Sequence, residues 1–120
     1  YCVPNHSPKV FVEHVDVVTG VGWDRAGELG EQAARFHETR FVVSNLGAFD
    51  FETPDHSMRL RSVHPGVTVD EVIEATGFEL ALPEGGASAV PESRPPTDEE
   101  LEWIDRIDPK GLRHREVKEP

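Results

Sequence analysis

Cysteine and long apolar runs are what this sequence most plainly lacks. Cys2 is the only cysteine among 120 residues, so an internal disulfide is excluded and no cysteine pair can hold a metal ion. No apolar run approaches the ~18 residues that a membrane-spanning helix requires. Apolar residues make up only 37% of the chain, which predicts one small domain with an irregular tail. We therefore expect a soluble, cytoplasmic protein without a membrane partner.

Basic residues are also few. The 12 lysines and arginines are outnumbered by 23 aspartates and glutamates, and the formal net charge is −11. Proteins that bind nucleic acid present a basic surface to the phosphates, so we expect no nucleic-acid partner. An anionic ligand would likewise need cations that another chain supplies.

The familiar patterns of reactive side chains are absent as well. The six histidines form neither HxH nor HExxH, so no metal site is predicted. Cys2 has no evident base beside it, and Ser44 does not lie in a G-x-S-x-G elbow. The sequence therefore predicts no self-sufficient catalytic constellation.

The stretch from residue 41 to residue 80 carries the clearest structural signals. Phe41 to Phe51 has apolar residues on both alternation phases, which predicts one central strand covered on two faces. Met58 to Arg61 alternates apolar and charged residues, which predicts a half-exposed hairpin partner whose arginines face water. The His-Pro-Gly sequence at 64–66 then ends that strand.

A capping box follows directly. Thr68 can accept from the backbone of Glu71 while Glu71 reaches back to Thr68, which predicts a helix from about Val69 to Thr76. Gly77 is placed to close this helix in the left-handed conformation.

A second capping box, Thr97 with Glu100, predicts a short terminal helix over 97–108. Its apolar stripe is widened by Trp103. Because a helix this short is marginal alone, we expect it to rest on its own domain or on a neighbouring chain.

The other segments carry weaker signals. Tyr1 to Pro8 is predicted to be a loop, Val10 to Thr19 a strand, and Asp24 to Glu38 a helix whose apolar positions include Leu29, Ala33 and Phe36. The Pro-, Gly- and Ser-rich residues 83–96 predict a linker without fixed secondary structure. We expect four units: a domain part at 1–82, the linker at 83–96, the terminal helix at 97–108 and a charged, frayed tail at 109–120.

Four residues are candidate substrate contacts. Asn45 and Gly47 interrupt an otherwise apolar strand, where a buried amide is costly without a partner. They form either a strand bulge satisfied by backbone or the lining of a substrate or subunit cleft. His64 is either a turn residue or a group that faces substrate, and the same alternatives hold for His6.

An ordered run of short motifs carries a family resemblance. The motifs are FVEHVDVVT at 11–19, VVSNLGAF at 42–49, MRL at 58–60, SVHPGVT at 62–68 and ATGF at 75–78. Together they resemble the C-terminal half of the β subunit of family I coenzyme A transferases. The chain looks most like the branch that opens the last steroid rings in actinobacteria by hydrolysing a carbon–carbon bond in a ring-bearing CoA thioester.

The resemblance implies an open α/β sheet of the NagB/RpiA/CoA-transferase type, here its C-terminal portion with a short terminal helix. It also implies an α-subunit partner in a heterodimer or heterotetramer, an active site at the subunit interface, and an acyl-CoA substrate with no further cofactor. Because the chain starts at Tyr1, we expect an N-terminal half of the subunit to be missing here.

The catalytic glutamate is the main departure from the family. In the transferases it lies in a Ser-Glu-Asn-Gly motif that this sequence lacks, and in the ring-opening branch it belongs to the α partner. The resemblance therefore implies no catalytic residue in this segment, and neither Glu13 nor Glu71 fills the gap. Two alternatives stay open: a true CoA transferase acting between carboxylic acids, and a non-catalytic interaction module that uses the terminal helix.

Overall fold

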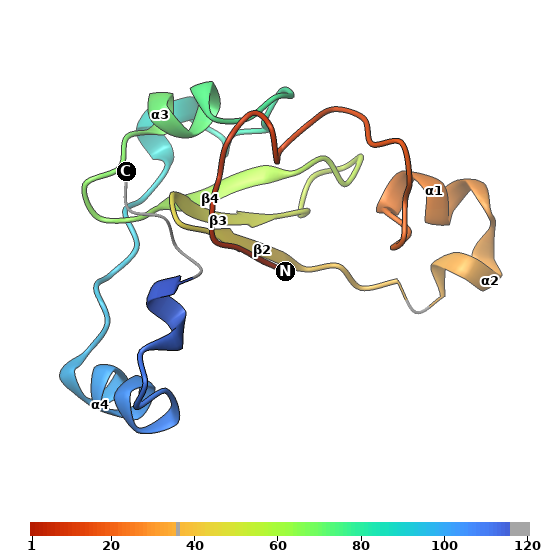
Figure 1. Ribbon diagram of the computed structural model, residues 1–120. Helices are drawn as coiled ribbons and strands as arrows, with labels where there is room; N and C mark the ends of the chain where they lie inside the picture. The colour runs from red at the N-terminus through yellow and green to blue at the C-terminus, as the bar shows by residue number, and fades with distance from the viewer. Residues whose placement is uncertain (36, 116–120) are drawn as a thin grey trace.

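The structure is a computed structural model that describes residues 1–35 and 37–115. Figure 1 shows a small sheet with short helices around it and a helical arm beyond. The elements in chain order are β1 (Cys2–Val3), α1 (Trp23–Glu28), α2 (Glu31–Ala34), β2 (Phe41–Ser44), β3 (Gly47–Asp50), β4 (Arg59–Val63), α3 (Val69–Glu74), η1 (Gly86–Ala89), α4 (Asp98–Ile107) and η2 (Leu112–Arg115).

The sheet has the strand order β1-β2-β3-β4. β1 runs parallel to β2, whereas β2, β3 and β4 form an antiparallel meander. The register between β3 and β4 shifts between Ala48 and Phe49, as in a β-bulge. The short β1 replaces only the start of the loop predicted over Tyr1 to Pro8, because the Val43 amide donates to the Tyr1 carbonyl at 2.8 Å and draws the N-terminus onto the sheet edge; residues 4–8 form the predicted loop.

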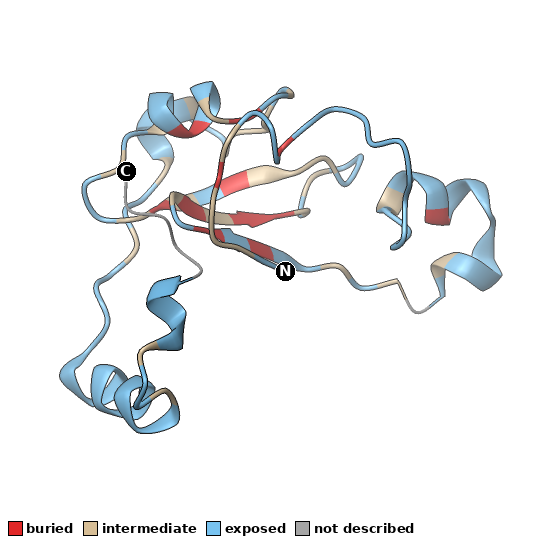
Figure 2. Cartoon of the chain, in the orientation of Figure 1, coloured by how far each residue is buried: buried red, intermediate tan, exposed pale blue. Residues whose placement is uncertain are grey.

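The core is small and lies between the sheet and α3. Figure 2 shows that the buried residues are concentrated on β2, β3 and β4, with few elsewhere. The buried apolar cluster comprises Phe11, Val42, Phe49, Leu60, Val63 and Val72. Because α3 contributes only Val72 to this cluster, most of the apolar burial comes from the strands.

The predicted central strand over Phe41 to Phe51 is in fact a tight hairpin. The Ser44 side-chain oxygen accepts hydrogen bonds from the backbone amides of Leu46 at 3.1 Å and Gly47 at 3.3 Å, and these bonds reverse the chain. β2 then alternates exposed and buried residues, so it is covered on one face only. The prediction of one strand covered on two faces is wrong for this reason.

The predicted partner strand and first capped helix are confirmed as β4 and α3. Thr68 accepts from the Glu71 amide at 3.2 Å, and the Glu71 carboxylate accepts from the Thr68 amide at 2.7 Å. The ending differs from the prediction, since Gly77 does not adopt a positive φ. Its amide donates to the Phe11 carbonyl at 2.7 Å, and an added Cβ would lie 2.5 Å from that oxygen. Gly77 is therefore needed for close backbone approach.

The strand predicted over Val10 to Thr19 does not form. Val12 makes one isolated bridge to Gly77, and the described residues give the segment no further strand pairing. A strand needs the edge of a neighbouring strand for its backbone hydrogen bonds. Without such an edge, Val15 and Val17 remain exposed.

The helix predicted over Asp24 to Glu38 is divided into α1 and α2. Gly30 lies between them with a φ of 87°, which a continuous helix does not permit. Ala26 is the buried residue of this pair, whereas Leu29 and Ala33 are exposed. The Phe36 position of the prediction lies outside the described residues.

The linker predicted over 83–96 has more structure than expected. It contains η1, and its later part runs along β4, where the Val63 amide donates to the Pro91 carbonyl at 3.1 Å and the Ser93 amide donates to the Val63 carbonyl at 2.8 Å. The prediction of no fixed structure is wrong here because β4 would otherwise leave these backbone groups without a sheet partner.

The terminal helix is confirmed as α4, with its capping box formed by Thr97 and Glu100. No residue of α4 is buried. The Cα radius of gyration is 16.2 Å, whereas about 14 Å is typical of a compact domain of this length.

Part of the predicted frayed tail, residues 116–120, lies outside the described residues. Within the described part of the chain, no helix is long and apolar enough to span a bilayer.

Candidate functional site

The structure brings all four predicted substrate contacts to the turn between β2 and β3. The His6 amide donates to Asn45 Oδ1 at 2.8 Å, and the His64 amide donates to the Leu46 carbonyl at 2.9 Å. Gly47 begins β3 on the same turn. Residues from three separate stretches of sequence therefore meet at one turn.

The His6 side chain is a buried link between the turn and α3. Its Nδ1 lies 2.9 Å from Ser44 Oγ, and its Nε2 lies 3.0 Å from Thr76 Oγ1. Thr76 Oγ1 donates its proton to the Val72 carbonyl at 2.7 Å, so this oxygen accepts from the imidazole. The neutral tautomer with the proton on Nε2 follows, and Ser44 then donates to Nδ1. Burial lowers the pKa of His6, which favours this neutral form.

The Ser44 and His6 pair has the spacing of a nucleophile and base, yet its setting is structural. Ser44 is buried, and its oxygen already accepts from the amides of Leu46 and Gly47. The His6 ring stacks on Phe11 with the centroids 3.8 Å apart. A substrate would have to displace this packing to reach the hydroxyl, so the pair acts as a clamp on the turn.

His64 holds the same turn from its other side. Its Nε2 donates to the Ser44 carbonyl at 2.9 Å, which leaves Nδ1 to accept from the Ser93 hydroxyl at 2.9 Å. The residue is half-buried and lines an open hollow of about 570 Å³ beside Arg94 and Glu100. Both ring nitrogens have partners in the chain, and a substrate-facing role for His64 stays a prediction.

Asn45 and Gly47 differ in their surroundings. Asn45 is exposed at the tip of the turn, whereas Gly47 is buried where β3 approaches β4. A Cβ on Gly47 would lie 2.5 Å from the Ser62 carbonyl oxygen, so only glycine fits. The structure thus gives Gly47 a packing role, and the substrate-binding roles of all four residues remain predictions.

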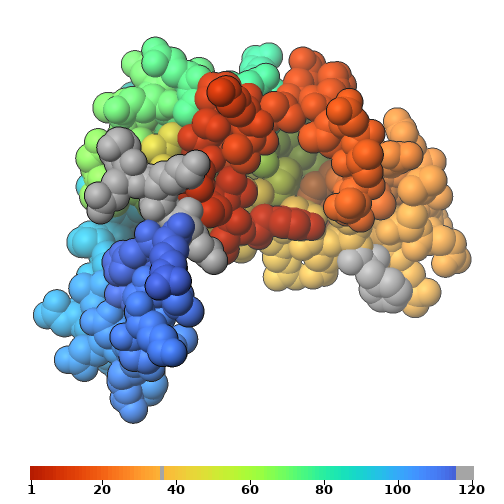
Figure 3. Space-filling model, viewed as in Figure 1, coloured from red at the N-terminus to blue at the C-terminus, as the bar shows by residue number. Residues whose placement is uncertain are grey.

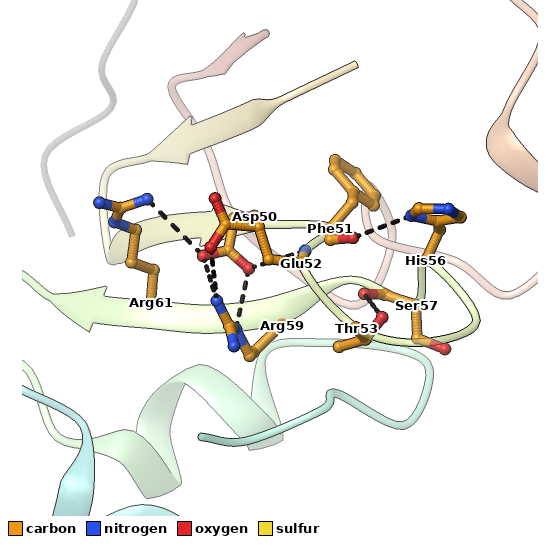
Figure 4. A network of polar contacts seen from close by, with 8 residues as sticks. All are labelled: Asp50, Phe51, Glu52, Thr53, His56, Ser57, Arg59 and Arg61. Atoms are coloured by element: carbon orange, nitrogen blue, oxygen red, sulfur yellow. Dashed lines mark hydrogen bonds and ion pairs between the residues drawn. The ribbon is translucent and has the colours of Figure 1, made fainter. Parts of the chain in front are cut away.

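An ion-pair network that the sequence did not reveal lies at the other end of β3 (Figure 4). Asp50 is fully buried and binds Arg59 through two hydrogen bonds, at 2.9 Å to Nε and 2.8 Å to Nη2. Arg61 lies 3.8 Å from the same carboxylate, and Glu52 lies 3.2 Å from Arg59. The bond to Asp50, with the nearby negative charge, raises the pKa of Arg59.

This network corrects the expectation that both arginines face water. Arg59 is directly opposite Asp50 in the register of β3 and β4, and its side chain folds over the buried carboxylate. Arg61 is half exposed and lies over the Phe41 ring at 5.1 Å. The alternating pattern identified the strand but not the pairing, which depends on the hairpin register.

A cleft of about 550 Å³ opens beside the β3–β4 turn. Trp23 forms one wall, stacked on His56 with the centroids 4.2 Å apart and edge-on to His37 at 4.8 Å. No local sequence pattern joins α1 to the turn, so the sequence alone does not predict this cluster. The rim carries the carboxylates of Glu13, Asp24, Asp55 and Glu79.

The Asp55 carboxylate of this rim stays charged at neutral pH. Hydrogen bonds from Ser57 lower the pKa of Asp55 to about 2. Such a rim disfavours the phosphates of a CoA ester, which would bind where cations are available. Within the described part of the chain, no group of three or more His, Cys, Asp or Glu side chains is arranged to hold a metal ion.

Comparison with known proteins relates this geometry to a family. No family model matches the chain. The chain is 50% identical to the cholesterol ring-cleaving hydrolase IpdB subunit of Mycobacterium tuberculosis over 119 residues, which cover 98% of this chain and 46% of that subunit. The crystal structure of Rhodococcus jostii IpdAB contains a chain with 48% identity and a TM-score of 0.84, which matches 99% of this chain and 46% of its own length. This chain is a homologue of the IpdB subunits.

The fold is that of the CoA transferases. Glutaconate coenzyme A-transferase from Acidaminococcus fermentans matches 99% of this chain and 44% of its own length, with a TM-score of 0.72 at 21% identity, which shows the shared fold alone. The resemblance to the ring-opening branch and the predicted open α/β fold are therefore confirmed. The chain spans somewhat less than half the length of the IpdB relatives that it matches.

Proposed function

We propose that this chain forms part of the β subunit of a heteromeric enzyme that opens a ring in a steroid-derived acyl-CoA during cholesterol or steroid breakdown. The enzyme adds water across a carbon–carbon bond. The carbonyl carbon of that bond receives the water oxygen and becomes a carboxylate as the carbon–carbon bond breaks, and the other carbon receives a proton. The CoA thioester is the substrate and no further cofactor is required. We place the reaction in the cytoplasm.

One observation carries this proposal. Identity of 50% to an IpdB subunit extends over 98% of the chain, and the matched chain of IpdAB has the same fold with a TM-score of 0.84. Identity at this level, over an aligned span that includes both the sheet and α4, supports a shared reaction better than the fold does alone, since one fold serves many reactions.

The described residues suit a supporting role in that reaction. The buried clamp of Ser44 with His6 and His64 fixes a turn, and the Asp50 network fixes the far end of the same hairpin. These side chains fix the backbone around them, and their hydrogen-bonding groups already have partners within the chain. We propose that the essential glutamate is supplied by the α-subunit partner in a heterodimer or heterotetramer, and that no residue of this segment is catalytic.

The charge of the chain also supports a second subunit. The net charge is −11, and the rim of the cleft beside the β3–β4 turn carries carboxylates. The phosphates of CoA need Lys or Arg side chains, or helix N-termini, which a basic partner provides. An active site shared between subunits satisfies this requirement.

CoA transfer between carboxylic acids is the second candidate, because glutaconate CoA-transferase has this fold. The two reactions differ in where the oxygen comes from and where CoA ends. Hydrolysis of the ring leaves CoA on the opened product, whereas a transferase moves CoA to an acceptor acid.

A labelled-water experiment tests the proposal. The complete subunit that contains this chain is co-expressed with an α subunit, and the purified complex is incubated with a ring-bearing steroid-derived acyl-CoA in water enriched in oxygen-18. The expected product is a ring-opened CoA ester with one oxygen-18 atom in its new carboxylate. CoA on an added carboxylic acid would establish the transferase instead. No association with any α subunit would leave a non-catalytic interaction module.

A further inference from the structure

The outer face of α4 is an apolar surface that the described chain leaves uncovered. We infer that this face docks into an apolar groove, rimmed by Lys and Arg, on the α-type partner subunit. The inference rests on the proposed function because it assumes that partner. It adds the element that makes the contact and the chemistry of the surface that receives it.

The apolar face is wide along α4 and contains one charged side chain, Glu100. At 100° per residue, its apolar residues cover about half of the helix circumference. They are Leu101, Trp103, Ile104 and Ile107. Trp103 is 52% exposed and Ile107 is 79% exposed, and Figure 3 shows the arm projecting from the body of the molecule. A tryptophan flanked by aliphatic side chains is the composition found at the centre of protein interfaces.

Polar contacts orient α4, and Glu100 makes one of them from within the apolar face. The Arg94 guanidinium forms two hydrogen bonds with Glu100, at 2.8 and 2.7 Å, and Ser93 is tied to β4 through the Val63 carbonyl at 2.8 Å. At the other end of α4, Arg113 donates to Asp105 at 2.7 Å. The helix is thus held in place before it meets a partner, which lowers the ordering cost of association.

The charged side chains of α4 indicate which kind of partner can bind its apolar face. Four acidic side chains lie outside the apolar face, two of them at its borders (Glu99 and Asp105), and the cation beside that face, Arg106, lies over the Trp103 ring at 4.6 Å. The acidic side chains are Asp98, Glu99, Glu102 and Asp105. Two copies of a chain with net charge −11 would bring like charges together along this helix. A different subunit with an apolar groove and a basic rim meets both requirements.

Binding of the complete subunit to its α partner, measured by calorimetry, tests the inference. Trp103→Ala and Ile107→Glu should each raise the dissociation constant at least about tenfold, as expected for buried interface residues. Glu102→Gln is the matched control outside the apolar face and should change it less than about threefold. Because α4 has no buried residue, the circular dichroism spectrum of each free variant should match that of the unmodified subunit.

Hydroxyl-radical footprinting of Trp103 identifies the occupant. The inference requires Trp103 to be reactive in the free subunit and protected in the complex. Protection in the free subunit at every concentration would show that its own polypeptide covers α4, and protection that appears only as concentration rises would show a second copy. Either result overturns the inference. Tight α binding that ignores Trp103→Ala overturns it while leaving the proposed function intact, whereas absence of α binding by the unmodified subunit defeats the proposed function itself.

Discussion

The core region, which comprises β2, β3, β4 and α3, and the periphery, which comprises residues 13–35, residues 37–40 and α4, are built in different ways. In the core region, Phe49 and Leu60 are fully buried, and the buried side-chain nitrogens and oxygens of the described chain all have partners. In the periphery, apolar side chains such as Val17 and Ile107 are mostly exposed. The core region buries its apolar side chains within the chain, whereas the periphery leaves many of its apolar side chains exposed. Matched substitutions in the two regions can break or sharpen this comparison.

Removing the charge of Asp50 should have the largest effect. Asp50→Asn leaves the Arg59 guanidinium without its bidentate partner in a place where water reaches it poorly. Breaking a fully buried pair costs about 3–5 kcal/mol, and the partial exposure of Arg59 lowers the expected loss to about 2–3 kcal/mol. Urea unfolding followed by circular dichroism measures the change.

The peripheral control is Glu38→Gln, which breaks the ion pair with Arg40. That pair is as short, at 2.7 Å, but both of its side chains are mostly exposed. Exposed pairs contribute little, so no measurable change in the free energy of unfolding is expected. Equal losses for the two variants would contradict the difference between the regions.

Glycine replacement should act with opposite signs in the two regions. Gly47→Ala puts a Cβ 2.5 Å from the Ser62 carbonyl oxygen, and the backbone must shift at a cost of about 1–3 kcal/mol. Gly27→Ala, within α1, meets no atom within 4 Å and should stabilise that helix by about 0.5–1 kcal/mol. The urea midpoint reports the first change, and hydrogen exchange of α1 amides reports the second. A neutral Gly47→Ala would show that β3 and β4 can separate without loss.

The pH dependence of stability should trace to His6. Burial lowers the pKa of His6, so the unfolded chain takes up a proton at a higher pH than the folded chain does. Stability from this residue is complete above the ordinary histidine pKa near 6.5, and it is lost as pH falls through 6.5 toward the folded pKa. Urea midpoints measured between pH 7.5 and about 5 should therefore decline.

Two variants assign this slope. His6→Gln should flatten the decline, although it also lowers stability at neutral pH by disturbing the bonds to Ser44 and Thr76. His14→Gln, at a side chain that is 91% exposed, should leave the slope in place. A slope that survives His6→Gln would move the titrating group elsewhere.

Sequence reasoning succeeded where a local signal and a tertiary contact agree. Both capping boxes form because each needs only residues three positions apart. β4 forms where the alternation of Met58 to Arg61 predicted it. The family resemblance also came from local motifs, and the fold followed from it.

The wrong predictions concern segments whose conformation depends on contacts between residues that are far apart in the sequence. Ser44 turns the chain because its hydroxyl meets two amides and His6, which no strand pattern reveals. Val10 to Thr19 has strand composition but lacks an edge to pair with among the described residues. The pairing of Asp50 with Arg59 can be predicted only once the register of β3 and β4 is known. The sequence singled out the four candidate substrate contacts. It did not show that they meet at one turn, because that arrangement exists only in the folded chain.

The two capping boxes provide the finest comparison, because the same motif lies in both regions. Thr68→Ala removes the cap of α3, whose Val72 is fully buried, so the whole fold should lose about 1 kcal/mol. Thr97→Ala removes the same bond at 3.2 Å from α4, which buries no residue. The end of α4 should then fray locally, with faster amide exchange but an unchanged urea midpoint. If Thr97→Ala lowered the midpoint as much as Thr68→Ala, α4 would unfold together with the core region, and its exposed face could not be regarded as independent of the sheet.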